Sequence, residues 1–232
     1  MEDGSNPPYL AVLRHSVRLD MVEEDGEDDV PWPDRQERPW DTPITDYDLP
    51  RTVLKAALPQ NHEITAIYSS PFRRCLQTAA VAALHLDIAQ ILVHRGLGEV
   101  MGCVRNLQNG DKQEDDYLMT GKDCEQTVQL ASGGKVTMKS SFLKDTTTPP
   151  WNETYSQSAM RLGRILRELQ RKHAAMKQSV LVVTHGDALE AAARAFLGPP
   201  VDGVYDLDFC AMMVLDANQK LVSHHGLKLL EL

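Results

Sequence analysis

Short apolar runs recur along the chain, and three of them end beside residues suited to chemistry. Residues 9–13, 64–68 and 180–184 are mostly apolar stretches of five residues. Runs of this length and composition indicate buried strands. Arg14-His15 follows the first run, and His185-Gly186 follows the third. Because ligands bind at the carboxyl ends of strands in open parallel sheets, we expect these ends to meet at one site.

Helical patterns alternate with these strands, at about residues 49–58, 70–84, 153–172 and 187–197. Ser70-Pro71 is a favourable helix start, since serine can cap free amide groups and proline suits the first helical position. Thr154 and Gln157 have the spacing of a capping box at the start of the third helix.

Further strands are predicted at 91–94 and in a terminal hairpin of 209–215 and 221–224. The alternation of strands and helices predicts an α/β fold, a three-layer α/β/α sandwich with a mostly parallel central sheet. We assign residues 1–232 to a single domain, a length that one domain can reach.

Two stretches lack a regular pattern. Residues 20–43 are rich in acid and proline and are predicted to form a loop. The acidic run 23–29 within it is expected to be solvated, or to form a rim that selects substrates by charge. Residues 102–150 hold several glycines and few long apolar runs, and we expect an irregular insertion or lid beside the active site.

Charge and cysteine content narrow the classes of partner. The net charge is −9, so nucleic acid and anionic membranes are not expected partners. We see neither a signal-peptide pattern nor an apolar run long enough to span a membrane. The four cysteines are widely spaced without a CxxC pair, which is typical of reduced thiols, and we expect a cytoplasmic protein.

The residues at the strand ends suit the chemistry of a phosphate group. Arginine donates hydrogen bonds in a planar fork and keeps its charge; the candidates are Arg14, Arg18 and one of Arg73 or Arg74. A neutral imidazole can attack phosphorus and form a phosphohistidine. Neighbouring guanidinium groups favour that neutral form, because they disfavour a second cation.

The leaving oxygen in such a reaction needs a proton, which a carboxylic acid can supply. Glu99 follows a short predicted strand in a loop with two glycines and is our candidate for this acid. Asp187 and Glu114 are the alternatives.

Together these motifs resemble those of the histidine phosphatase superfamily, which has the phosphoglycerate mutase-like fold. Arg14-His15-Ser16 is similar to the family's Arg-His-Gly. Residues 69–79 are similar to its Ser-Ser-Pro-x-x-Arg-x-x-Gln-Thr-Ala, which singles out Arg74. His185-Gly186 is similar to its second His-Gly, and Glu99 to its acid in a Gly-Leu-x-Glu context.

The resemblance implies a role for each matched residue. His15 would be the phosphorylated nucleophile and Glu99 the proton donor. His185 would be a second catalytic histidine that also holds the transferring phosphoryl group. The other phosphate-binding residues would be Arg14, Arg18 and Arg74. Neither a metal nor a cofactor would be needed.

Position 18 favours a phosphatase over a mutase. Cofactor-dependent mutases typically have serine three residues after the nucleophile, whereas Arg18 resembles the phosphatase domains of T-cell ubiquitin-ligand proteins and ecdysteroid-phosphate phosphatases. The segment 41–45 is similar to that branch as well. Two departures stand out: Ser16 replaces the family glycine, and Val17 replaces a glutamate. Ser16 is either tolerated, in contact with the substrate, or a cause of slower turnover.

We therefore predict a phosphomonoester hydrolase that works through a phosphohistidine on His15. One alternative is a cofactor-dependent phosphoglycerate mutase, which would require a bisphosphoglycerate primer. The other is a weakly active module that binds phosphorylated ligands. The expected partner is a phosphorylated small molecule or a phosphopeptide, and a homodimer is compatible with the sequence.

Overall fold

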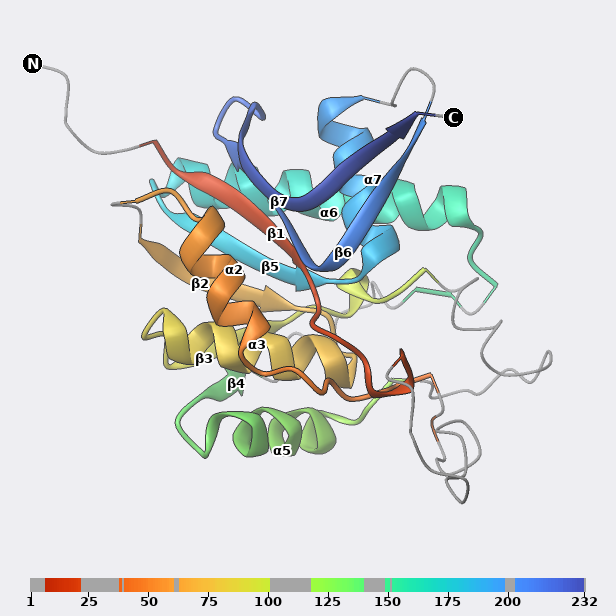
Figure 1. Ribbon diagram of the computed structural model, residues 1–232. Coiled ribbons are helices and arrows are strands. Elements are labelled where there is room, and N and C mark those ends of the chain that lie inside the picture. The colour runs from red at the N-terminus through yellow and green to blue at the C-terminus, as the bar shows by residue number, and fades with distance from the viewer. Residues whose placement is uncertain are drawn as a thin grey trace, which may run out of the picture.

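A seven-stranded sheet forms the centre of the molecule, in the strand order β4-β3-β2-β5-β1-β6-β7 (Figure 1). The computed structural model describes residues 7–21, 38, 40–60, 63–100, 118–139, 149–150, 152–198 and 203–231. The strands are β1 (Tyr9–Arg14), β2 (Ile64–Ser69), β3 (Gln90–Val93), β4 (Thr137–Lys139), β5 (Ser179–Thr184), β6 (Gly203–Asp216) and β7 (Leu221–Glu231).

The first five strands in this order, β4, β3, β2, β5 and β1, run parallel to one another. Strand β6 is antiparallel to both β1 and β7. The β1–β5 ladder ends at the pair Arg14–Thr184, and the β2–β5 ladder ends at Ser69–Val183. The carboxyl ends of β1, β2 and β5 therefore lie side by side, which confirms the expected meeting of the three motifs.

Helices cover both faces of the sheet. They are α2 (Leu49–Ala57), α3 (Arg73–His85), α5 (Gly121–Ser132), α6 (Tyr155–Ala175) and α7 (Gly186–Leu197), with short 3-10 helices η1 (Leu19–Met21) and η2 (Arg95–Leu97). Helices α2, α3 and α5 lie on one face, and α6 and α7 lie on the other (Figure 1). The arrangement is the predicted three-layer α/β/α sandwich.

Strand β1 shows why the sheet is covered twice. Ala11 and Leu13 point into the core beneath α2, α3 and α5, whereas Leu10 and Val12 point into the core beneath α6 and α7. Successive side chains of a strand alternate between faces, so an unbroken apolar run needs a packed layer on each side.

Part of the predicted insertion 102–150 belongs to the sheet itself. Residues 118–139 form α5, which packs on α3, and β4, which pairs with β3 as the edge strand. Thr120 caps α5 by accepting from Asp123 N, and Gly133 ends it with a φ of 59°. The glycines that suggested irregular chain are thus partly a helix stop, and a strand of three residues is too short to stand out in the sequence. Residues 101–117 and 140–148 lie outside the described part of the chain.

Of the two predicted helix starts, one is confirmed and one differs in the structure. The capping box of α6 is confirmed, since Thr154 and Gln157 satisfy each other's backbone amide groups. Helix α3, however, begins at Arg73 after Phe72, without a side-chain cap. Ser70 Oγ accepts from Phe72 N at 3.4 Å just before the helix and also lies 2.8 Å from His185 Nε2, so this serine belongs to the site.

The terminal hairpin is longer than predicted and is irregular next to the site. The β6–β7 register shifts between Leu207 and Met212, and Cys210 within that stretch has a φ of 56°. Such a bulge in a β-strand redirects side chains and often lies beside an active site. Cys75, Cys124 and Cys210 are free buried thiols, while Cys103 lies outside the described residues. No described helix is long and apolar enough to cross a membrane.

Candidate active site

His15 follows β1 and is 2% exposed. Its backbone N–H donates to Thr184 O at 2.9 Å and its carbonyl accepts from Cys210 N at 3.2 Å, so β5 and β6 both fix its main chain. Its Nδ1 lies 2.8 Å from Ser16 O. Because a carbonyl oxygen only accepts, Nδ1 carries the hydrogen and Nε2 keeps its lone pair. His15 is therefore held in the tautomer that a nucleophile at Nε2 requires.

Arg14 lies beside His15 at the end of β1. Its Nη1 donates to Leu207 O, and its Cζ lies 4.3 Å from the centre of the Phe209 ring. Its Nε is buried and has no hydrogen-bond partner among the described residues. A buried donor without an acceptor is costly, so this atom would gain from a bound anion.

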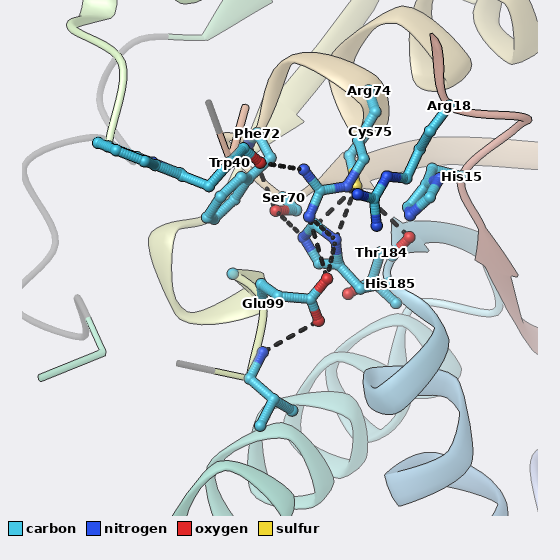
Figure 2. A network of polar contacts seen from close by, with 12 residues as sticks. His15, Arg18, Trp40, Ser70, Phe72, Arg74, Cys75, Glu99, Thr184 and His185 are labelled. Atoms are coloured by element: carbon cyan, nitrogen blue, oxygen red, sulfur yellow. Dashed lines mark hydrogen bonds and ion pairs between the residues drawn. The ribbon is translucent and has the colours of Figure 1, made fainter. Parts of the chain in front are cut away.

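Arg74 enters the site from the first turn of α3 (Figure 2). It is 2% exposed; its Nη1 donates to Trp40 O at 2.9 Å and its Nη2 to Glu99 Oε2 at 3.0 Å. Its Nε, like that of Arg14, is buried without a partner in the described part of the chain. The site thus holds the buried Arg74 and the half-buried Arg14, each with a buried Nε–H that is unused among the described residues.

Glu99 and His185 are paired in the structure. Glu99 Oε2 lies 3.0 Å from His185 Nδ1, and Glu99 Oε1 accepts from Val100 N at 3.0 Å. Arg74 Nη2 also lies 3.0 Å from His185 Nδ1, and Ser70 Oγ contacts the other ring nitrogen of His185. The Glu99 carboxylate therefore occupies the atoms of Arg74 and His185 that were expected to hold a phosphate.

The protonation states follow from burial and from these neighbours. Burial, with Arg74 and His185 adding to it, lowers the pKa of His15 well below its usual value. Burial also lowers the pKa of His185 to about 4, although Glu99 opposes the shift. Burial would raise the pKa of Glu99, but His185 and Arg74 outweigh it and hold this pKa well below its usual range. At neutral pH both imidazoles are neutral and Glu99 is ionised.

Arg18 borders the site, but its guanidinium group binds the carboxylate of Asp20. Its Nε donates to Asp20 Oδ1 at 2.9 Å, and its Nη2 pairs with Asp20 Oδ2. Its side chain lies near His15 in Figure 2. Its backbone bridges to Ile44, and its charge contributes to the lowered pKa values of Arg14 and His185. A phosphate could therefore engage Arg18 only in exchange for, or together with, Asp20.

Of the two alternative acids, Asp187 lies among the described residues. Asp187 lies in the first turn of α7, and its charge acts on Arg14. Glu114 lies outside the described residues. Among the described residues no group of three or more His, Cys, Asp or Glu is arranged to hold a metal ion.

Several site residues were not predicted. Trp40 offers its carbonyl to Arg74, Phe209 covers Arg14, and Thr184 contacts the loop before Glu99 through its hydroxyl. Ser70 was assigned to a helix cap, although its place in the Ser-Ser-Pro motif was a usable signal. Nothing in the sequence marks Trp40 or Phe209, because both reach the site from segments distant along the chain.

Comparison with known families gives one match over most of the chain. A family model described as the histidine phosphatase superfamily (branch 1) matches residues 31–136 and 134–225. These stretches contain Arg74, Glu99 and His185, whereas Arg14 and His15 precede them. No curated protein sequence matches the chain.

Solved structures share the fold at low sequence identity. The ecdysone phosphate phosphatase of Bombix mori in complex with tungstate is 16% identical, with 93% of this chain and 92% of that chain covered and a TM-score of 0.54. A mycobacterial glucosyl-3-phosphoglycerate phosphatase with VO3 is 19% identical, with 97% and 96% covered and a TM-score of 0.50.

Proposed function

The chain belongs to branch 1 of the histidine phosphatase superfamily, and from this membership we propose that it hydrolyses phosphomonoesters through a phosphohistidine on His15. Membership supports an enzyme of phosphatase or mutase type. The observation that carries the finer proposal is the pair of buried, unpartnered Nε–H groups of Arg14 and Arg74 beside a neutral His15. They can bind two phosphate oxygens and leave the His15 lone pair facing phosphorus.

The first half of the reaction forms the phosphoenzyme. His15 Nε2 attacks phosphorus, the ester P–O bond breaks, and the leaving oxygen takes a proton from Glu99. In the second half, water attacks phosphorus and gives a proton to Glu99, while the P–N bond to His15 Nε2 breaks. Inorganic phosphate and free His15 are the products. The guanidinium groups of Arg14 and Arg74 stabilise the transferring phosphoryl group in both halves.

Glu99 must first acquire the proton that it donates. In the structure it is ionised, because Arg74 and His185 pair with it. A substrate phosphate that takes over these two partners removes the groups that hold the pKa down and adds a nearby negative charge. Both changes raise the pKa of Glu99. Substrate binding therefore prepares the acid.

Quenched labelling tests the nucleophile. An enzyme quenched during turnover of a labelled phosphomonoester should carry acid-labile, base-stable label, and His15→Ala should lose both the label and turnover. His85→Ala, at the exposed end of α3, is the matched control and should keep both. Label that persists on His15→Ala would reject the assignment.

Two simple additions separate the alternatives. Full activity without a bisphosphoglycerate primer is expected of a phosphatase, and a primer requirement would establish the mutase.

We also propose that arginines supply the positive charge, so EDTA should leave the rate unchanged. Loss of activity on chelation, with recovery on adding a divalent ion, would contradict this. A panel of phosphorylated metabolites and phosphopeptides should then identify the substrate, which we propose is of one of these classes.

A further inference from the structure

A buried arginine on α6 holds the loop that carries Glu99. Arg161 Nη1 donates to the carbonyl oxygen of Gly96 and, at 3.3 Å, to that of Gly98. Its Nη2 donates to Glu99 O at 3.3 Å. Thr184 Oγ1 donates to Leu97 O at 3.0 Å. Each carbonyl from residue 96 to residue 99 thus accepts a hydrogen bond from a side chain of another element.

The remaining donors of Arg161 bind Glu153. Arg161 Nε and Nη2 each lie 2.8 Å from a different oxygen of the Glu153 carboxylate, and Ser158 Oγ donates to the same carboxylate at 2.6 Å. Arg161 is 8% exposed and Glu153 is 3% exposed. A guanidinium group has five N–H groups, and these contacts supply an acceptor for all of them. The planar fork is therefore fixed on both sides.

We propose that Arg161, with Glu153, is a positioning residue that holds the 96–99 loop so that the Glu99 carboxylate faces His185 and Arg74. The inference rests on the proposed function, because it assigns the purpose of the clamp to the proton donor. Arg161 touches no reacting atom, and it acts only through the main chain of the loop.

The energetics favour positioning over stability as the role of this pair. A buried ion pair often contributes no more stability than apolar side chains of similar volume. Apolar side chains, however, could not bind the carbonyl groups of the loop. A small displacement of a catalytic group can cost as much as about 100-fold in rate. The pair therefore gives the loop a geometry that apolar packing would not.

The test replaces the pair by apolar side chains. The double variant Glu153→Leu/Arg161→Met leaves no unpaired buried charge, so it should stay folded while it loses the carbonyl donors. Arg164→Met, at an exposed position of the same helix, is the matched control. The single variants Arg161→Lys and Glu153→Gln test the same contacts with smaller changes in side-chain volume, should the double variant not fold. Circular dichroism establishes which variants are folded.

Single-turnover rates on two substrates separate positioning from general damage. In the double variant, phosphorylation by an alkyl phosphate should slow about 10- to 100-fold. With p-nitrophenyl phosphate, whose leaving group hardly needs a proton, the rate should fall less than about 3-fold. Added to Glu99→Gln, the double variant should cost little more, because both changes act on one group. Equal losses on both substrates, or a full further loss in the Glu99→Gln background, would overturn the inference.

Orthovanadate affinity tests whether Arg161 and Glu153 position Glu99, even if Glu99 is not the proton donor. Because Glu99 occupies Arg74 and His185, Glu99→Gln should bind orthovanadate more tightly. A clamp that holds Glu99 there predicts tighter binding in the double variant too, whereas a damaged site predicts weaker binding. Calorimetric titration gives the sign, and weaker or unchanged binding would overturn the inference. Equal alkyl phosphate turnover in Glu99→Gln and the parent would instead reject the acid role alone.

Discussion

The side chain of Arg14 lies against the backbone of Gly186. A Cβ atom at Gly186 would come within 3.1 Å of Arg14 Nε and 3.4 Å of Arg14 Cζ. A side chain at position 186 would therefore require Arg14 to shift by a few tenths of an ångström, whereas glycine lets the first residue of α7 lie beside a guanidinium group. Arg14 and Gly186 are 172 residues apart in the sequence, and they lie side by side because β1 and β5 pair in parallel.

We expect Gly186→Ala to lower kcat/KM for a phosphomonoester about 10-fold. The added methyl group pushes Arg14 away from its contacts with Leu207 and Phe209, so its unused Nε–H no longer points at the phosphate. Gly163→Ala on α6 is the control, since its nearest contact, Ala195 Cβ, lies at an ordinary 3.4 Å. Steady-state kinetics on both variants, with melting curves, measure the difference. Equal activity in the two variants would show that Arg14 does not need this space.

The role of Glu99 is tested by varying the leaving group. Glu99→Gln keeps the shape of the side chain and removes its proton, and general acid catalysis is worth about 10²- to 10⁴-fold. Single-turnover phosphorylation by an alkyl phosphate should fall within that range, and phosphorylation by p-nitrophenyl phosphate should fall much less. Single-turnover rates are required, because the proposed mechanism also has Glu99 activate water in the second half-reaction. Equal losses on both substrates would move the acid role to Asp187 or to a residue of the predicted insertion.

Ser16→Gly restores the family glycine, and we expect it to affect stability more than chemistry. Ser16 Oγ donates to Asp46 O at 2.6 Å, so the hydroxyl group is already engaged away from the phosphate pocket. Removing this partly buried hydrogen bond should lower the free energy of unfolding by about 1 kcal/mol and leave kcat/KM within about 3-fold. Ser16→Ala separates the loss of the hydroxyl group from the added backbone freedom. A large fall in kcat/KM in both variants would mean that the hydroxyl group contacts the substrate.

The lowered pKa values of the two histidines predict a pH-dependent stability. Between about pH 6.5 and pH 4 the unfolded chain binds a proton at His185 that the native state excludes. The contribution of this group to the free energy of unfolding should therefore have its full value above pH 6.5. It should fall as the pH drops towards 4, by about 1.4 kcal/mol per pH unit for each such proton. His15, whose pKa is also lowered, adds to this slope.

Urea unfolding at several pH values measures that slope. His185→Ala should have a shallower slope than the parent between pH 6.5 and pH 4, and the exposed control His85→Ala should keep the parent's slope. The comparison uses slopes rather than absolute stabilities, because His185→Ala also leaves a cavity. A parent slope that is flat over this range would contradict the predicted protonation states.

The sequence identifies the parts of the site that are local in the chain. Arg14, His15 and His185 follow apolar runs whose strands pair side by side, so their meeting follows from the parallel sheet itself. Arg74 lies in the first turn of α3, where a motif of fixed spacing places it. These residues could be predicted because each is set by the element on which it lies.

The contacts between distant segments could not be predicted in this way. The pairing of Glu99 with His185 depends on where the 96–99 loop runs, and that path is set by Arg161. The sequence does contain a signal for Arg161, because it lies one helical turn from Ile165 in the buried stripe of an amphipathic helix. A charged residue in such a stripe needs a buried partner, but only the fold shows that this partner is Glu153.

The carboxylate of Glu99 places a negative charge from the protein against Arg74 and His185. In the proposed mechanism, Glu99 therefore pairs with Arg74 and His185 again when phosphate leaves. The net binding free energy of phosphate is then the difference between its own interaction with these donors and that of the Glu99 carboxylate. If the proposed hydrolysis takes place, we expect each turnover to end in this exchange, and inhibition by the inorganic phosphate product to be weaker than Arg14 and Arg74 alone would impose.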